Sequence, residues 1–97
     1  MRFFDTHAHL NDESFDTDRA ALIEGLPSCG AELIMDVACA AEDFEKTLEI
    51  TAKYPFIYGA YGIHPHYASD PGENWEARLR RALCDKKAAC LGEIGLD

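Results

Sequence analysis

Short apolar segments alternate with helical segments along the whole chain, and this alternation restricts the fold more than any other feature. Strands that are joined through helices run parallel, with right-handed connections. The apolar segments are near-continuous, as in parallel strands buried on both faces. The pattern predicts an α/β fold with a first helix capped by Asp16 or Thr17. Strands are expected at residues 2–6, 32–38, 56–63 and 88–94, and further helices at residues 41–53 and 74–84.

Four parallel strands, which make up about the first four β/α units of a barrel, fit two architectures. They form either an open sheet or the first half of a TIM barrel, (β/α)8, which typically needs about 250 residues. A half barrel leaves two parallel edge strands unpaired, and such edges favour aggregation. Because no repeat, low-complexity segment or linker interrupts the chain, we expect residues 1–97 to form one domain.

The composition is typical of a soluble globular protein. Hydrophobic residues make up 47% of the 97 positions and charged residues 28%. No apolar run of about 18 residues predicts a transmembrane helix, so no membrane partner is expected. Asp5 interrupts any apolar core of a secretion signal. We therefore expect a cytoplasmic protein whose cysteines are free, mostly buried thiols, namely Cys29, Cys39, Cys84 and Cys90.

The net charge of −9 restricts how the chain can meet nucleic acid. A protein that binds DNA mainly by releasing counterions from phosphates needs a basic face. The three arginines of the third helix, Arg78, Arg80 and Arg81, fit a solvated helix face better than such a patch. An enzyme that contacts phosphates through bound metal ions is not excluded, because those cations add to the formal charge.

Two histidines, His7 and His9, stand one residue apart at the end of the first extended segment. Alternate residues of an extended chain point to the same side, so both imidazoles face one way, with Asp5 one step earlier. Imidazole nitrogens at this spacing can bind a single divalent cation. Barrel active sites are built at the carboxyl ends of strands. We predict that His7 and His9 bind a metal ion; the alternative is two histidines in a polar turn.

The other two histidines, His64 and His66, follow the third predicted strand, so all four histidines come directly after two strands. Pro65 stiffens this loop and prevents further strand pairing. We predict that His64 and His66 contact the substrate, including its phosphate, or support a metal ion from outside its ligands. The alternative role is a hydrogen bond that stabilises the loop.

Glu93 lies among glycines and aliphatic residues near the end of the fourth strand. Charged groups in such surroundings are seldom left without an ion pair or a metal. We predict that Glu93 is a metal ligand that bridges two ions; an ion-paired carboxylate at the rim of a barrel is the alternative. Asp36 could line the same site, but we favour its interpretation as a polar strand-end residue. For Asp97, support of the site and a plain position at the end of the chain both stay open.

Three motifs together resemble one family. Residues 3–11 (FFDTHAHLN) resemble the opening signature of the TatD-like metal-dependent deoxyribonucleases, residues 62–66 (GIHPH) its third-strand motif, and residues 92–97 (GEIGLD) its fourth-strand motif. The resemblance implies a (β/α)8 barrel of the metallo-dependent hydrolase superfamily, of which this sequence covers the N-terminal part. It also implies that the whole enzyme hydrolyses phosphodiester bonds in DNA with one or two divalent cations.

By this resemblance, His7 and His9 hold one ion and Glu93 contacts one or both. Glu93 and His64 are then the catalytic residues, and His64 and His66 bind substrate. A metal-activated water is the expected nucleophile. Mixed nitrogen and oxygen ligands suit Zn²⁺, Mn²⁺ or Fe²⁺ better than Mg²⁺, although Mg²⁺ stays possible. Two further histidines and an aspartate of the family come from later strands that this sequence does not contain.

Two other readings stay open. A related hydrolase of the same superfamily could act on C–N bonds or phosphate monoesters, although many amidohydrolases carry a modified lysine where this chain carries Glu93. The chain could instead be a truncated, non-catalytic half barrel. Because only three expected metal ligands are present, we expect little nuclease activity from the isolated chain.

Overall fold

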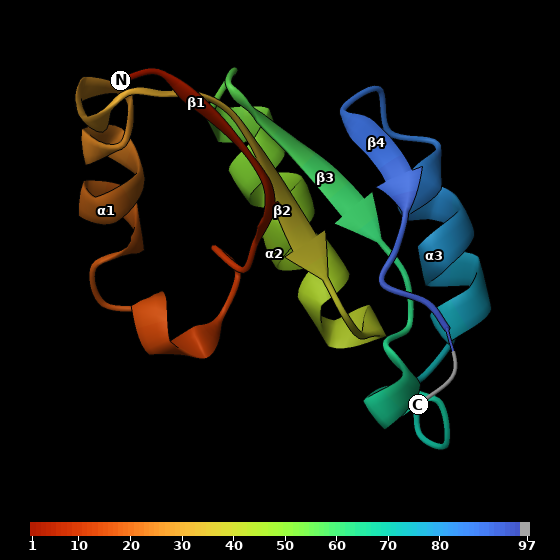
Figure 1. The fold of residues 1–97 in the computed structure, drawn as a ribbon. Helices are drawn as coiled ribbons and strands as arrows, with labels where there is room; N and C mark the ends of the chain where they lie inside the picture. Colours follow the sequence, from red (N-terminus) through yellow and green to blue (C-terminus); the bar gives the residue numbers. More distant parts are fainter. Residues whose placement is uncertain (96–97) are drawn as a thin grey trace.

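A computed structural model describes residues 1–95, and its four strands form one parallel sheet in the order β1-β2-β3-β4 (Figure 1). This arrangement confirms the predicted α/β fold: three successive β/α units are followed by a fourth strand. The strands are β1 (Phe3–Ala8), β2 (Ala31–Ala38), β3 (Ile57–Tyr61) and β4 (Ala88–Leu91). The helices are α1 (Arg19–Gly25), α2 (Ala41–Lys53) and α3 (Trp75–Leu83), with 3₁₀ turns at Glu13–Phe15, Pro27–Cys29 and Pro65–Tyr67.

The ends of the strands differ from the predicted ones in a way that affects the site. β1 continues beyond the predicted end at Thr6, so His7 lies within the strand. β3 ends at Tyr61 and β4 at Leu91, both earlier than expected. The glycine-rich segment after β4 therefore forms a loop, and Glu93 stands on this loop rather than on a strand. The bounds of α2 agree with the prediction.

The predicted cap of the first helix was wrong, because α1 begins at Arg19. The Asp16 carboxylate instead forms ion pairs with two basic side chains: its Oδ1 lies 2.7 Å from Arg19 Nη2 and 3.2 Å from Lys46 Nζ. Arg19 also donates from Nε to the Leu10 carbonyl oxygen at 2.7 Å and from Nη2 to the Asp12 carbonyl oxygen at 2.7 Å. The guanidinium group thus holds the loop that leaves β1.

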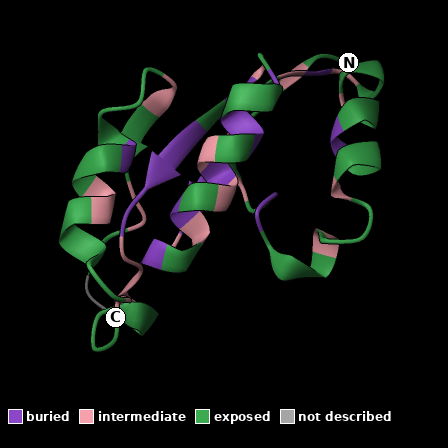
Figure 2. Ribbon diagram, turned by 180° about the vertical axis from the view of Figure 1, so that it is seen from behind, coloured by how far each residue is buried: buried purple, intermediate pink, exposed green. Residues whose placement is uncertain are grey.

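The hydrophobic core lies between the sheet and its helices. One cluster includes Ile23 of α1, Ile34 of β2 and Ile57 of β3. A second cluster centres on Phe44 of α2 and Tyr61 of β3, whose rings meet edge to face with centroids 5.7 Å apart. In Figure 2, seen from behind, buried residues concentrate on α2 and on the strands that it covers. This packing sets the position of the strand ends.

The opposite face of the sheet is open in the described part of the chain. Phe4, Leu33 and Tyr58 are 62%, 41% and 37% exposed, although the first two face each other across β1 and β2. The expectation that the strands are buried on both faces is therefore wrong for residues 1–95. Only one layer of helices covers the sheet here, so apolar side chains on its other face meet solvent.

Two expectations from composition had different outcomes. None of the helices in residues 1–95 is long and apolar enough to span a bilayer. The cysteines are unpaired, as expected, but they are not mostly buried: Cys29, Cys84 and Cys90 are exposed and Cys39 is half-buried. Cys90 stands on β4, which is an outer strand of the sheet.

Phe44→Ala should lower the free energy of unfolding by about 3–5 kcal/mol, because it empties a site in the packed layer. Phe4→Ala should cost about 1 kcal/mol or less, because that side chain is already largely hydrated. Urea unfolding followed by circular dichroism measures both values. Equal losses for the two variants would show that both faces of the sheet are packed.

Candidate metal centre

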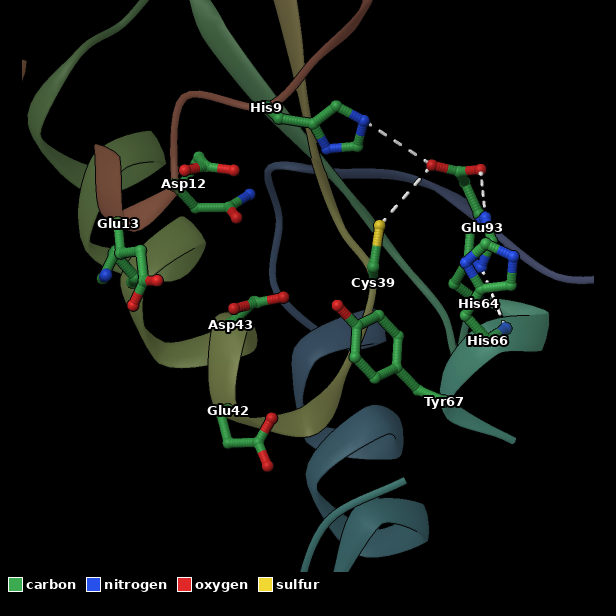
Figure 3. Close-up of a pocket in the computed structure, with 12 residues that line it drawn as sticks. His9, Asp12, Glu13, Cys39, Glu42, Asp43, His64, His66, Tyr67 and Glu93 are labelled. Carbon is green, nitrogen blue, oxygen red and sulfur yellow. Dashed lines mark hydrogen bonds and ion pairs between the residues drawn. The ribbon is translucent and has the colours of Figure 1, made fainter. Parts of the chain in front are cut away.

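Three side chains meet beside the carboxyl ends of the strands. His7 lies in β1, His9 follows β1 directly, and Glu93 stands on the loop after β4. His7 Nε2 lies 3.0 Å from Glu93 Oε2, and His9 Nε2 lies 3.7 Å from the same oxygen. One potential ligand atom from each residue lies within 4.8 Å of the other two. Figure 3 shows His9 and Glu93 facing each other across this gap. The structure therefore brings together the three residues predicted to bind metal, although Glu93 is more than 80 positions away from both histidines in the sequence.

The donor set suits a divalent cation. Two imidazole nitrogens and one carboxylate oxygen are typical ligands of Zn²⁺, Mn²⁺ and Fe²⁺. His7 and His9 are exposed and Glu93 is half-buried, so an ion on these three atoms would keep open positions for water and substrate. Open coordination positions distinguish catalytic from structural metal sites.

Gly62, directly after β3, lets the loop of Glu93 come this close. A Cβ atom at position 62 would lie 2.6 Å from the Glu93 carbonyl oxygen and 2.7 Å from the Gly92 carbonyl carbon. The Gly92 N–H donates to the Tyr61 carbonyl oxygen at 2.9 Å, which ties the same loop to the end of β3. Any larger residue at position 62 would push Glu93 away from the histidines.

The hydrogen bond of His9 determines which of its nitrogens is available. His9 Nδ1 lies 3.1 Å from the carbonyl oxygen of Val37 in β2. Because a carbonyl oxygen only accepts, Nδ1 must carry the proton, and the neutral ring then has a bare Nε2. That bare nitrogen is the one that faces Glu93. His9 is therefore held in the tautomer that a metal ligand requires.

His64 is held in the opposite tautomer. Its Nδ1 accepts a hydrogen bond from the backbone N–H of His66 at 3.1 Å, so the neutral ring carries its proton on Nε2. Nε2 points toward Glu93 Oε1 at 3.5 Å (Figure 3). The backbone N–H of His64 donates to the Cys39 carbonyl oxygen at 2.8 Å, which fixes the loop against β2. His64 is thus oriented as a hydrogen-bond donor beside the candidate metal centre.

A cleft of about 630 Å³ opens in front of these groups. Its walls include His9, His64, His66 and Glu93, and its floor reaches the start of α2. Besides its histidines, the lining within residues 1–95 contains one lysine, Lys46, and five carboxylates, those of Asp12, Glu13, Glu42, Asp43 and Glu93. A cleft with this charge repels an anionic substrate unless cations occupy it.

Cys39, at the end of β2, is a neighbour of Glu93 that sequence reasoning missed. Its Sγ donates to Glu93 Oε2 at 3.5 Å. Burial, together with the adjacent Glu93 carboxylate, raises the pKa of Cys39 to about 12, so the group stays a thiol at neutral pH. Partial burial favours a higher pKa for Glu93, but hydrogen bonds from His7 and Cys39 outweigh this effect and hold that pKa below its ordinary value.

The remaining predicted acids have different surroundings. Asp5 accepts from the His7 backbone N–H at 3.0 Å, and the β1–β2 register shifts between Asp5 and Ala8, so the regular alternation assumed for Asp5 and the histidines is interrupted. Asp36 is fully buried toward α2, which is more than the polar strand end that we expected. Asp97 lies outside the described residues. No local signal marked Cys39, because its contact with Glu93 spans 54 positions.

Glu93→Gln should weaken Co²⁺ binding by about 100-fold or more, because removal of a ligand costs at least as much as loss of a group that supports one. Glu76→Gln is the matched control: this exposed carboxylate on α3 pairs with Arg80. Calorimetry and the visible absorption of Co²⁺ measure the affinities. Equal affinities for the two variants would contradict this centre.

Cys39 should react with iodoacetamide more slowly than Cys29, Cys84 and Cys90, because its raised pKa leaves little thiolate at pH 8. Peptide mass spectrometry measures each rate. Glu93→Gln should speed the reaction at Cys39, since it removes an adjacent negative charge. Uniform rates at the four cysteines would contradict the described contact.

Comparison with known proteins gives a consistent result. The profile described as TatD related DNase matches residues 4–97. The uncharacterized metal-dependent hydrolase YabD of Bacillus subtilis is 38% identical over 94 residues, which are 97% of this chain and 37% of YabD. The 3'-5' ssDNA/RNA exonuclease TatD of Cronobacter sakazakii is 29% identical over 97% of this chain and 36% of its own length.

A solved structure agrees with these matches. The crystal structure of YjjV, a TatD homologue from Escherichia coli, superimposes with a TM-score of 0.86 at 33% identity, over 99% of this chain and 38% of YjjV. The chain thus spans well under half the length of the relatives that it matches. That span includes the four strands and all three motifs, and the chain belongs to the TatD-related DNase family.

Proposed function

We propose that this chain supplies part of the active site of a metal-dependent nuclease that hydrolyses phosphodiester bonds in DNA. The observation that carries this proposal is the convergence of His7, His9 and Glu93 at the carboxyl edge of a parallel sheet. Membership of the TatD-related DNase family supports the reaction class. A relative named as a 3'-5' exonuclease of ssDNA and RNA supports a single-stranded substrate with a free 3' end.

In this proposal, His7, His9 and Glu93 hold one or two divalent cations, with Zn²⁺, Mn²⁺ and Mg²⁺ as the candidates. Such a cation, when bound, supplies Lewis acidity for the phosphoryl group and acidifies a water molecule. The negative charge of the cleft carboxylates attracts the cation. The bound cation in turn offsets the repulsion between these carboxylates and a phosphate group of the substrate. Glu93, whose pKa is lowered by the hydrogen bonds from His7 and Cys39, serves as the anionic ligand.

His64 and His66 are the proposed substrate contacts of this chain. His64 lines the cleft and carries a proton on Nε2 beside Glu93, so this ring can donate to a phosphate oxygen as negative charge develops on it. His66 lines the same cleft, with its ring centroid 4.5 Å from that of His64. His64 then acts in catalysis together with Glu93, and His66 positions the substrate.

We also propose that the protein works in the cytoplasm. Four unpaired cysteines, three of them exposed, suit a reducing compartment.

The natural protein that carries this chain should shorten a 5′-labelled single-stranded DNA oligonucleotide with Mn²⁺ or Mg²⁺ and lose this activity in chelator. His9→Ala should lower kcat/KM by about 100-fold or more, because the cation loses a ligand. Glu76→Gln, on α3 and outside the lining of the cleft, should leave kcat/KM unchanged. Gel analysis of the shortened products measures each rate.

Two parallel substrates separate the alternatives. Preferred hydrolysis of p-nitrophenyl phosphate or of a cyclic amide such as hydantoin would contradict the nuclease proposal. The 97-residue chain alone should show little turnover, since it provides three ligands in the described residues. Turnover by this chain that disappears with His7→Ala and with chelator would overturn that last expectation.

A further inference from the structure

We infer that Asp36 of β2 is a positioning residue for the metal centre, because it fixes the backbone that follows His9. This inference rests on the proposed function, since it concerns the same centre. Asp36 is fully buried, and its hydrogen bonds go to Leu10, Asn11 and Thr47 rather than to the three candidate ligands. Its effect on the centre must therefore pass through the turn after β1.

The Asp36 carboxylate accepts hydrogen bonds from four donors. Its Oδ1 receives the backbone N–H of Leu10 at 2.7 Å, the backbone N–H of Asn11 at 3.2 Å and the Asn11 side-chain amide at 3.1 Å. Its Oδ2 receives the Thr47 hydroxyl of α2 at 2.8 Å. Beyond the end of β1 at Ala8, Asp36 Oδ1 thus takes the place of the backbone acceptors that a neighbouring strand would provide. The turn directly after His9 is held at two consecutive backbone N–H groups.

Val37, the next residue of β2, holds His9 itself. Its carbonyl oxygen accepts from His9 Nδ1 at 3.1 Å and also from the Asn11 amide at 2.8 Å. Two neighbouring residues of β2 therefore fix both the backbone beyond His9 and the ring of His9. If the turn shifts, the ring loses its carbonyl partner and with it the bare Nε2 that faces Glu93. Metal sites tolerate displacements of only about 0.5 Å in their ligands.

The chemistry of Asp36 fits this role better than a role in packing. A buried carboxylate without a cationic partner is costly, and burial raises the pKa of Asp36 even though four hydrogen bonds oppose the shift. An apolar residue of similar size would pack under α2 without that cost. It would, however, leave the buried N–H groups of Leu10 and Asn11 without acceptors. The carboxylate is therefore explained by the turn that it holds.

The test measures two properties of Asp36→Leu, whose side chain has similar size but no acceptor. The first is the His9 tautomer in the metal-free chain at pH 8, from long-range ¹⁵N correlation spectra of the imidazole. The second is the Co²⁺ affinity and absorption spectrum. We expect mixed His9 tautomers and a Co²⁺ affinity about 10–100-fold weaker. Asp36→Asn, which keeps an oxygen at Oδ1, should restore both properties to within a few-fold of wild type.

Ile57→Ala is the control for stability alone. Ile57 is fully buried at the start of β3, at the opposite end of the sheet, so this variant should lose stability and keep the His9 tautomer and the Co²⁺ affinity. If Asp36→Leu does not fold, Thr47→Val replaces it. That variant removes one donor from Asp36 and one acceptor from Asn11, and it should weaken Co²⁺ binding several-fold.

The outcomes separate this inference from the proposed function. A single Nδ1–H tautomer of His9 and wild-type Co²⁺ affinity in folded Asp36→Leu, or wild-type values in Thr47→Val where it replaces that variant, would overturn the inference. Failure of the wild-type chain to bind Co²⁺ would count against the proposed metal centre instead. The tautomer is measured without metal, so it tests the hold of Asp36 on His9 whichever way metal binding turns out.

Discussion

Parallel pairing of the four strands is the constraint on which the rest of the structure depends. In a parallel sheet every strand ends at the same edge, so the residues after each strand become neighbours whatever their distance in sequence. His7 and Glu93 are 86 positions apart, yet their side chains lie within hydrogen-bond distance. The packing of α2 against β2 and β3 keeps these ends in register, and Gly62 allows the last loop to close on the first strand.

Charge gives this edge its chemical character. Five carboxylates line the cleft together with a single lysine, and the whole chain carries a net charge of −9. A nuclease that binds DNA through basic side chains would carry more basic than acidic residues in its cleft. The acidic cleft is consistent with a protein whose positive charge comes from bound cations. The exposed apolar face of the sheet, with Phe4 and Leu33, is a separate feature that the helices of residues 1–95 do not cover.

Hydrogen bonds to backbone groups determine which ring nitrogen carries the proton in two of the histidines, His9 and His64. His9 donates from Nδ1 to a carbonyl oxygen, and His64 accepts at Nδ1 from an N–H group. Their Nε2 atoms are consequently different: one is bare and the other carries a proton. The two rings face the same Glu93 carboxylate with opposite capacities, the first to bind a cation and the second to donate a hydrogen bond.

The sequence by itself determined the order of strands and helices, the bounds of α2 and the grouping of chemically active residues after the strands. These features follow from local periodicity and from short motifs, which need no knowledge of distant residues. The convergence of His7, His9 and Glu93 was predictable, because the carboxyl ends of parallel strands lie at the same end of the sheet. The actual strand ends were less predictable, since glycine-rich residues such as Gly92 ended β4 early and put Glu93 on a loop.

Only the tertiary structure decided the tautomers of His9 and His64, the contact of Cys39 with Glu93 and the burial of Asp36 among four donors. Each of these depends on a hydrogen bond whose partners are brought together by packing, such as Asp36 of β2 with Leu10 and Asn11 of the turn after β1. Periodicity reports which face a residue occupies, but the free energy of a hydrogen bond depends on distances of a few tenths of an ångström. Those distances are set by the folded chain as a whole.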